Sequence, residues 1–259
     1  MNNRITKLFD SKKKDILSVF YTAGFPKLND TVRIASELEK AGADIIEIGI
    51  PFSDPVADGP TIQASNKVAL ENGMTVKVLL EQVREIRKTV KMPIILMGYL
   101  NPVMQYGVEK FVMDAAAAGV DGLILPDMPV YEFEEQYKEL FSQHNMCNTF
   151  LISPTTAEDR IKRIDAMTEG FIYAVSASST TGAKKDFTSE QVEYFKRLAG
   201  LKLKNPVLIG FGISDHSTFS RAASFGAGAI VGSAFITLLG KSTDLSADIA
   251  TFVKSLKGN

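Results

Sequence analysis

The run DIIEIGI (44–50) points to the fold class. After its first residue it is apolar and β-branched, with Glu47 as its one charged side chain. A strand with continuous apolar character, rather than alternation, is buried on both faces. This is typical of a parallel sheet covered by helices, so residues 44–50 predict an interior strand of an α/β protein.

Similar runs recur along the whole chain, with amphipathic, helix-period segments between them. The other strand runs are ILSVFYT (16–22), MPIILMGY (92–99), DGLILPD (121–127), NTFLIS (148–153), GFIYAVS (170–176), PVLIGFG (206–212) and GAIVGSA (228–234). The clearest helical segments are residues 29–42, 75–90, 108–119 and 214–226. Eight strand–helix units in a chain of 259 residues predict a (β/α)₈ TIM barrel.

The length of the chain and the absence of a boundary within it favour a single domain over residues 1–259. Ile5, Leu8 and Phe9 have helical spacing and predict a short N-terminal helix that closes the barrel bottom. No linker-like or low-complexity tract divides the sequence. A doubly wound open sheet is the alternative, but no G-x-G-x-x-G follows the first strand run.

Composition excludes several classes of function. The formal net charge of −1 argues against nucleic acid as the main partner. No apolar run reaches the ~18 residues of a membrane span, and the N-terminus does not resemble a signal peptide. We therefore expect a cytoplasmic protein. The single cysteine, Cys147, is predicted to be a core residue, and His144 and His216 lack metal-ligand spacing, so we expect no metal.

Strand spacing locates the functional face. The intervals that follow the runs at 44–50 and 170–176 are the longest, so loops 2 and 6 of the barrel are predicted to be extended. The first holds a spare helix at 61–73, and the second holds SASSTTGAKKD (176–186), which suits a moving lid. In barrels such extra length builds the active-site face.

Glu47 is the first candidate for catalysis. Strand alternation points it into the barrel, where burial disfavours its charged form and raises its pKa. A raised pKa suits a group that both gives and takes a proton near neutrality. The structural alternative is an ion pair with a Lys or Arg that reaches in from a loop. Asp54 and Asp58 follow on a loop with prolines at 51, 55 and 60, and one of the two is expected to be only a turn former.

Two late glycine-rich segments predict a phosphate site. GFGIS (210–214) and VGSAF (231–235) follow the last two strand runs, where barrels commonly bind phosphate through backbone N–H groups. Gly182 could close over the same group. The alternative is that these glycines only shape turns.

The missing residue types narrow the chemistry. No lysine lies within a strand run, so a Schiff-base aldolase is disfavoured. No Ser-His-Asp set or cofactor fingerprint is present. Proton transfer by carboxylates on a phosphorylated substrate remains, and both isomerisation and C–C cleavage fit.

Five segments together resemble one known family over essentially the whole chain. They are TAGFP (22–26), EIGIPFSDPVADGP (47–60), FIYAVS…TTGA (171–183), GFGIS (210–214) and VGSA (231–234). The chain is similar to the tryptophan synthase alpha chain family, and the second segment is the most specific. The resemblance implies cleavage of indole-3-glycerol phosphate to indole and glyceraldehyde 3-phosphate, without a cofactor in this chain.

The resemblance also implies roles for individual residues. Glu47 and Asp58 match the catalytic carboxylates, and Tyr173 lines the cleft near them. Phe20 and Leu100 are expected to hold the flat indole. Thr181 resembles the loop-6 threonine that orders Asp58. The expected phosphate positions are Gly182, Gly210, Gly212, Gly232 and Ser233.

A partner is implied as well. The family binds a beta chain that carries pyridoxal phosphate, in an α₂β₂ assembly, and Asp54, Asn101 and Pro129 resemble its contact surface. The chain departs from many relatives at Ala177 and Ser179, where they have arginine and glycine, so the lid is expected to differ. Two other functions stay open: an isomerase of the ribulose-phosphate-binding type, and a weakly active subunit that mainly activates the beta chain.

Overall fold

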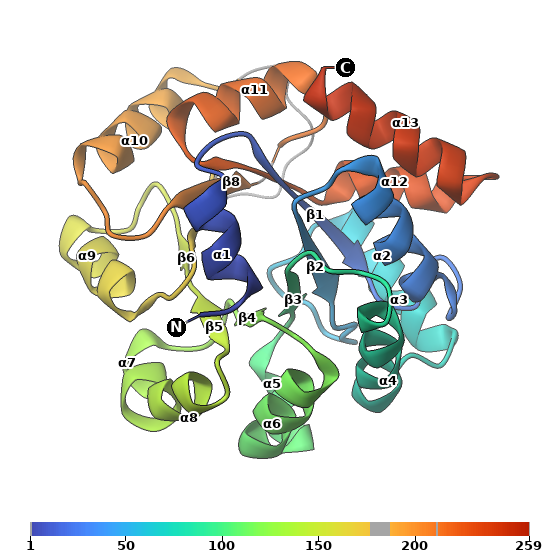
Figure 1. Ribbon diagram of the computed structural model, residues 1–259. Coiled ribbons are helices and arrows are strands. Elements are labelled where there is room, and N and C mark those ends of the chain that lie inside the picture. Colours follow the sequence, from blue (N-terminus) through green and yellow to red (C-terminus); the bar gives the residue numbers. More distant parts are fainter. Residues whose placement is uncertain (1, 177–186, 211, 259) are drawn as a thin grey trace.

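A computed structural model describes residues 2–176, 187–210 and 212–258 of the chain. Strands form a barrel that helices surround, and all the strand pairings among the described residues are parallel (Figure 1). The strand order is β5-β4-β3-β2-β1-β9-β8-β7-β6. The (β/α)₈ TIM barrel prediction is therefore confirmed.

Each predicted strand run coincides with a described strand, and most strands are shorter than predicted. The strands are β1 (Ile16–Thr22), β2 (Ile45–Gly49), β3 (Ile94–Met97), β4 (Gly122–Ile124), β5 (Cys147–Thr149), β6 (Leu151–Ile152), β7 (Ile172–Val175), β8 (Val207–Gly210) and β9 (Gly228–Val231).

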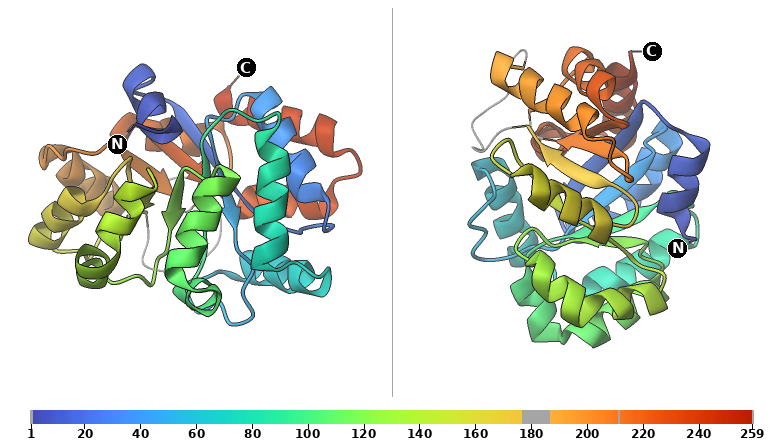
Figure 2. Two further views of the ribbon diagram at one scale, coloured as in Figure 1. Left: turned by 60° about the horizontal axis from the view of Figure 1, so that its bottom comes forward. Right: turned by 90° about the vertical axis from the view of Figure 1, so that its left-hand side faces the viewer.

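The helices lie around the barrel, as the side views show (Figure 2). They are α1 (Arg4–Ser11), α2 (Asp30–Ala41), α3 (Pro60–Glu71), α4 (Val76–Arg87), α5 (Leu100–Tyr106), α6 (Val108–Ala118), α7 (Val130–Glu132), the π-helix η1 (Phe133–Tyr137), α8 (Lys138–Gln143), α9 (Glu158–Met167), α10 (Ser189–Gly200), α11 (His216–Phe225), α12 (Ser233–Lys241) and α13 (Leu245–Lys257). Helix α3 is the spare helix expected in the second loop.

The fifth barrel strand is broken at Phe150. Its first half, β5, pairs with β4, and its second half, β6, pairs with β7. The Phe150 carbonyl accepts a hydrogen bond from the Tyr173 backbone N–H at 3.0 Å. One run of chain thus joins both ends of the sheet order and closes the barrel.

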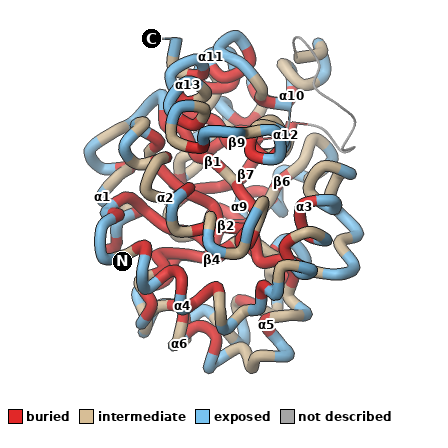
Figure 3. Tube along the Cα trace, turned by 90° about the vertical axis from the view of Figure 1, so that its right-hand side faces the viewer, coloured by how far each residue is buried: buried red, intermediate tan, exposed pale blue. Residues whose placement is uncertain are grey.

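Strand alternation produces two hydrophobic cores, and buried residues concentrate along the strands (Figure 3). Ile46 and Ile48 of β2 belong to the core between sheet and helices, whereas Ile45 belongs to the barrel interior. Glu47 shares the inner face with Ile45, as the alternation predicts. The interior core consists of Ile5, Phe9, Ile16, Ile45, Ile95, Ile124, Cys147, Phe171, Tyr173, Leu208, Ala227 and Ile230.

Helix α1 closes one end of the barrel, as predicted. Asn3 caps the helix in a capping box with Thr6, which satisfies backbone N–H groups of the first turn. Ile5 and Phe9 then enter the barrel interior. Cys147 is a buried residue of this core, as expected, and burial raises its pKa to about 12, so the thiol stays protonated.

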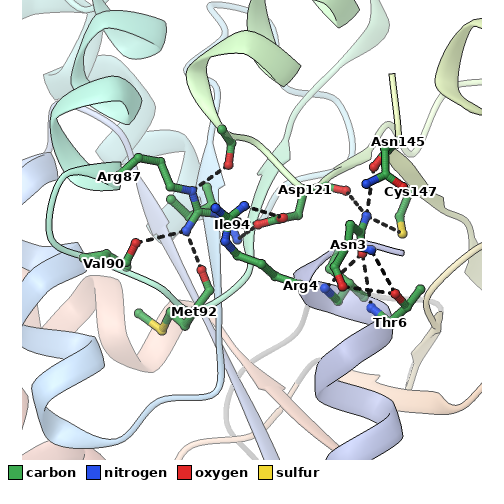
Figure 4. A network of polar contacts seen from close by, with 12 residues as sticks. Asn3, Arg4, Thr6, Arg87, Val90, Met92, Ile94, Asp121, Asn145 and Cys147 are labelled. Atoms are coloured by element: carbon green, nitrogen blue, oxygen red, sulfur yellow. Dashed lines mark hydrogen bonds and ion pairs between the residues drawn. The ribbon is translucent and has the colours of Figure 1, made fainter. Parts of the chain in front are cut away.

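A network of polar contacts fastens α1 to the barrel (Figure 4). The buried Asp121 carboxylate accepts hydrogen bonds from Arg4 at 3.0 Å, from the Ile94 backbone N–H at 2.9 Å, and from Arg87. The Asn3 side chain donates to the Asp121 carbonyl at 2.9 Å. One carboxylate therefore joins α1, α4 and β3 at this end of the barrel.

Replacing Asp121 by alanine is expected to destabilise the chain by about 3–5 kcal/mol, because it leaves Arg87 buried without its carboxylate. Urea unfolding followed by circular dichroism measures this loss. The matched control is Glu85→Ala, which breaks the exposed pair with Lys88 and should cost less than about 1 kcal/mol. Similar losses in the two variants would contradict the importance given to the Asp121 network.

Candidate active site

A cavity of about 450 Å³ opens where the strands end and the chain passes into its βα loops. It brings together many of the predicted site residues from distant parts of the sequence. Those that line it are Phe20, Glu47, Asp58, Tyr173, Gly212, Gly232 and Ser233. Thr181 and Gly182, like Ala177 and Ser179, lie outside the described residues.

Glu47 lies on the inner face of β2 and is fully buried. Burial raises its pKa from 4.5 to about 7, while a hydrogen bond from the Ser18 hydroxyl opposes part of that rise. The Ser18 Oγ to Glu47 Oε1 distance is 2.6 Å. A carboxyl group with this pKa holds its proton about half the time at neutral pH, so it can act as both acid and base.

Asp58 lies on the loop between β2 and α3. Burial raises its pKa, and a hydrogen bond with the Tyr99 hydroxyl opposes the rise. Tyr99 also accepts a hydrogen bond from the Ala57 backbone N–H at 2.9 Å. Gly59 and Pro60 begin α3 directly after Asp58, with proline at the first helical position, where it fits. The loop is thus held on both sides of the carboxylate.

Tyr173 completes a group of three titratable side chains. It lies on β7, on the inner face, and burial raises its pKa well above 10. The charges of Glu47 and Asp58 raise it further. The phenol therefore stays protonated at any ordinary pH, and it stands within electrostatic range of both carboxylates.

Gly210 provides the room for Tyr173. A Cβ atom added at Gly210 would lie 2.1 Å from Cε2 of the Tyr173 ring, far inside van der Waals contact. Gly210 is absent from the residues that line the cavity, unlike Gly212 and Gly232. Gly210 thus lies directly under the Tyr173 ring.

The apolar part of the cavity contains one of the two residues predicted to hold the indole. Phe20 lines it, together with Met97, Leu151 and Ile230. Leu100 is not among the lining residues; it begins α5, is partly buried and packs against the outer core. Its contact with the indole stays a prediction.

Glycines and a helix N-terminus form another part of the cavity wall. Gly212 has φ +79°, a left-handed conformation that favours glycine. Gly232 caps α12, and Ser233 begins it. The first N–H groups of a helix lack intrahelical acceptors and attract anions. Together with the hydroxyls of Ser214 and Thr237, which also line the cavity, this part of the wall suits a phosphate.

The three predicted partner residues are exposed at this end of the barrel. Asp54 lies on the loop after β2, Asn101 in α5, and Pro129 before α7. Val56 beside Asp54 is also exposed, at 91%. Tyr131 beside Pro129 is also exposed.

Two residues that contact the carboxylates, Tyr99 and Ser18, were not predicted from the sequence. Tyr99 lay within the predicted third strand run, and its position at the end of that run was the available signal. Ser18 carried no signal, because a serine inside an apolar strand has no pattern of its own. Among the described residues, no cluster of three or more His, Cys, Asp or Glu side chains could hold a metal ion. None of the described helices combines the length and hydropathy needed to cross a bilayer.

Comparison with known proteins identifies the family. A family model described as "Tryptophan synthase alpha chain" matches residues 7–258. The tryptophan synthase alpha chain of Flavobacterium psychrophilum is 54% identical over 90% of this chain and 92% of its own length. That of Flavobacterium johnsoniae is 51% identical over 98% of this chain and 100% of its own length.

Solved structures agree with this assignment. Mycobacterium tuberculosis tryptophan synthase superposes with a TM-score of 0.90 at 31% identity, covering 100% of this chain and 98% of that one. The Pyrococcus furiosus alpha subunit gives 0.88 at 34% identity, covering 96% and 99%. The chain belongs to the tryptophan synthase alpha chain family and is a lyase of tryptophan biosynthesis.

Proposed function

We propose that this chain cleaves indole-3-glycerol phosphate to indole and glyceraldehyde 3-phosphate with Glu47 and Asp58 as its catalytic residues. Family membership supports the reaction. The observation that supports the assignment of residues is Glu47 itself, a fully buried carboxyl group with a pKa of about 7 that lines the cavity.

Glu47 serves the reaction by giving one proton to the substrate and taking a different proton from it. Its protonated carboxyl donates to indole C3, and the resulting carboxylate then accepts the proton of the hydroxyl on the adjacent glycerol carbon. The C–C bond breaks as that hydroxyl becomes the aldehyde, and the bonding electrons return to the indole ring. The carboxyl ends in the form in which it began, so no other acid or base is needed.

Asp58 stabilises the intermediate. Protonation at C3 places positive charge on the indole nitrogen, and a carboxylate that accepts the N–H hydrogen bond stabilises this charge. Tyr99 holds Asp58 in place by its hydrogen bond. Tyr173, protonated and close to both carboxylates, is positioned to donate a hydrogen bond to the substrate.

The phosphate binds at Gly212, Gly232 and Ser233, which line the same cavity. Thr181 and Gly182 remain predictions for the same group and for the order of Asp58. Phe20 and Met97, which line the cavity, form an apolar wall for the indole ring, and Leu100 remains a prediction for the same ring. An apolar wall also keeps Glu47 desolvated, which maintains its raised pKa.

The assembly and its cofactor belong to the same proposal. Membership of the family implies a beta chain partner. We propose an α₂β₂ assembly in the cytoplasm, with residues 1–259 acting as one domain and pyridoxal phosphate held by the beta chain. Exposed residues near the cavity support a docking surface there: Asp54, Val56, Asn101, Pro129 and Tyr131.

Indole release tests the function. The isolated chain is incubated with indole-3-glycerol phosphate, with and without a tryptophan synthase beta chain. We expect slow release from the chain alone and a clear increase with the partner. Activity that appears only as a trace in both cases would favour the weakly active subunit, and isomerised substrate without indole would favour the isomerase.

The phosphate site gives a separate prediction. Gly232→Asp places a negative charge at the N-terminus of α12, so KM for indole-3-glycerol phosphate should rise by about tenfold or more through repulsion and lost space. Steady-state kinetics measure this. Gly240→Asp, in the last turn of the same helix, is the control and should leave KM unchanged. If KM is unaltered in Gly232→Asp, the phosphate does not bind at the N-terminus of α12.

A further inference from the structure

Ser18 is a polar residue in an apolar layer of the barrel. It lies on β1, two residues before Phe20, and is fully buried. Its register partners on the neighbouring strands are Ile45 of β2 and Ile230 of β9. A hydroxyl buried among such side chains costs stability unless it forms a hydrogen bond.

The hydrogen bond of Ser18 is made to Glu47. Its Oγ donates to Oε1 of the carboxylate at 2.6 Å, the length typical of an O–H···O⁻ bond with a charged acceptor. The second oxygen, Oε2, is also buried and has no hydrogen-bond partner among the described residues. The two oxygens of the carboxyl group therefore differ: Oε1 accepts a hydrogen bond from Ser18, and Oε2 accepts none from the described residues.

We propose that Ser18 is a positioning residue for the cleavage reaction: it holds Oε1 of Glu47, so that Oε2 is the oxygen that exchanges protons with the substrate. This inference rests on the proposed function, in which Glu47 is the acid and base. A carboxyl group held by one oxygen keeps one rotamer, and both proton transfers then use the same atom in the same place.

The same contact tunes the acidity of Glu47. The Ser18 hydroxyl donates to the ionised form and so favours it, opposing the effect of burial. Among the described residues, the titratable groups that line the cavity with Glu47 are Tyr173 from β7, Asp58 from the loop after β2, and Tyr99 after β3. No Lys, Arg or His is among the described residues that line the cavity. Ser18 thus favours the ionised form of Glu47, an effect that a nearby cation has in other sites, but it carries no charge itself.

The test compares Ser18→Ala with the unchanged chain in two measurements. Carboxyl ¹³C NMR of glutamate-labelled protein follows the Glu47 titration, with its signal identified by its absence in Glu47→Gln. Without the hydrogen bond, the titration midpoint is expected to rise by about 1 pH unit. Indole release should lose about tenfold in kcat with KM little changed, and its pH profile should shift in the same direction.

Two further variants separate positioning from packing. Thr168→Val removes another fully buried hydroxyl, one without a hydrogen-bond partner among the described residues, and should change neither measurement. Ser18→Thr keeps the hydroxyl and is expected to restore the midpoint. If an active Ser18→Ala chain keeps the Glu47 titration midpoint of the unchanged chain, the role given to Ser18 is wrong, and the proposed function still stands. If the unchanged chain releases no indole in the presence of its beta chain, the proposed function itself is wrong.

Discussion

Glu47→Gln is expected to abolish indole release, with a loss of about 10²–10⁴-fold in the single-turnover rate. The amide has nearly the same shape as the carboxyl group but cannot take up and return a proton in the required pH range. Substrate binding should change little, because the amide is nearly isosteric with the carboxyl group and other residues line the rest of the cavity. Rapid-quench measurement of indole and calorimetric titration with substrate check the two halves of this expectation.

The same substitution should stabilise the chain at high pH. The pKa of Glu47 is 4.5 when unperturbed and about 7 in the folded chain, so the folded state holds the proton more tightly across that window. Stability therefore falls as pH rises from 4.5 to 7, by about 3 kcal/mol in total. Glutamine removes this loss, so the variant should exceed the unchanged chain in urea unfolding at pH 8 and match it near pH 4.

Glu85→Gln serves as the control for this titration effect, because Glu85 is an exposed residue of α4. It should have the same pH dependence of stability as the unchanged chain. If the Glu47→Gln chain still releases indole at the normal rate, Glu47 is not the acid and base of the reaction. Equal stability at pH 8 would show that the carboxyl group is not desolvated.

Gly210→Ala should have the second large effect. The added methyl group would meet the Tyr173 ring at 2.1 Å, and the ring is buried, so it cannot turn into solvent. Overpacking of this kind costs about 1–3 kcal/mol or more, and displacement of Tyr173 should also reduce activity. Thermal unfolding and indole release measure the two losses.

A matched glycine shows whether the collision is the cause. Gly200, at the end of α10, has nothing within 4 Å of an added Cβ. Gly200→Ala should leave activity unchanged and alter stability by less than about 1 kcal/mol. In a Tyr173→Ala background, Gly210→Ala should no longer destabilise the chain. A cost that persists there would mean that strand β8, and not the ring, requires the glycine.

The barrel could be predicted because its strands are apolar on both faces and regularly spaced. The alternating direction of side chains along a strand correctly placed Glu47 on the inner face of β2. The ends of strands were harder, because they depend on where the chain turns in three dimensions. The third strand run was predicted over residues 92–99 but the strand ends at Met97, and the fifth strand changes its neighbour at Phe150.

The hydrogen bonds between side chains could not be predicted from hydrophobic periodicity or motif spacing. Ser18 and Tyr99 act on the two carboxylates from β1 and from the turn after β3. These contacts join residues far apart in the chain, and nothing in local composition marks them. The carboxylates themselves were visible because a charge in an apolar strand, or on a proline-rich loop, breaks the pattern around it.

The network around Asp121 has a consequence for the order of folding. Asn3 reaches partners 118 and 144 residues later in the chain, so its contacts require the closure of long loops. During synthesis the first helix must wait for β4 and β5 to emerge before it can dock. We expect these contacts to form after the rate-limiting step, so Asn3→Ala should speed unfolding and leave the refolding rate nearly unchanged in stopped-flow experiments. Helix α1 would then dock late, although it is made before the strands that it contacts.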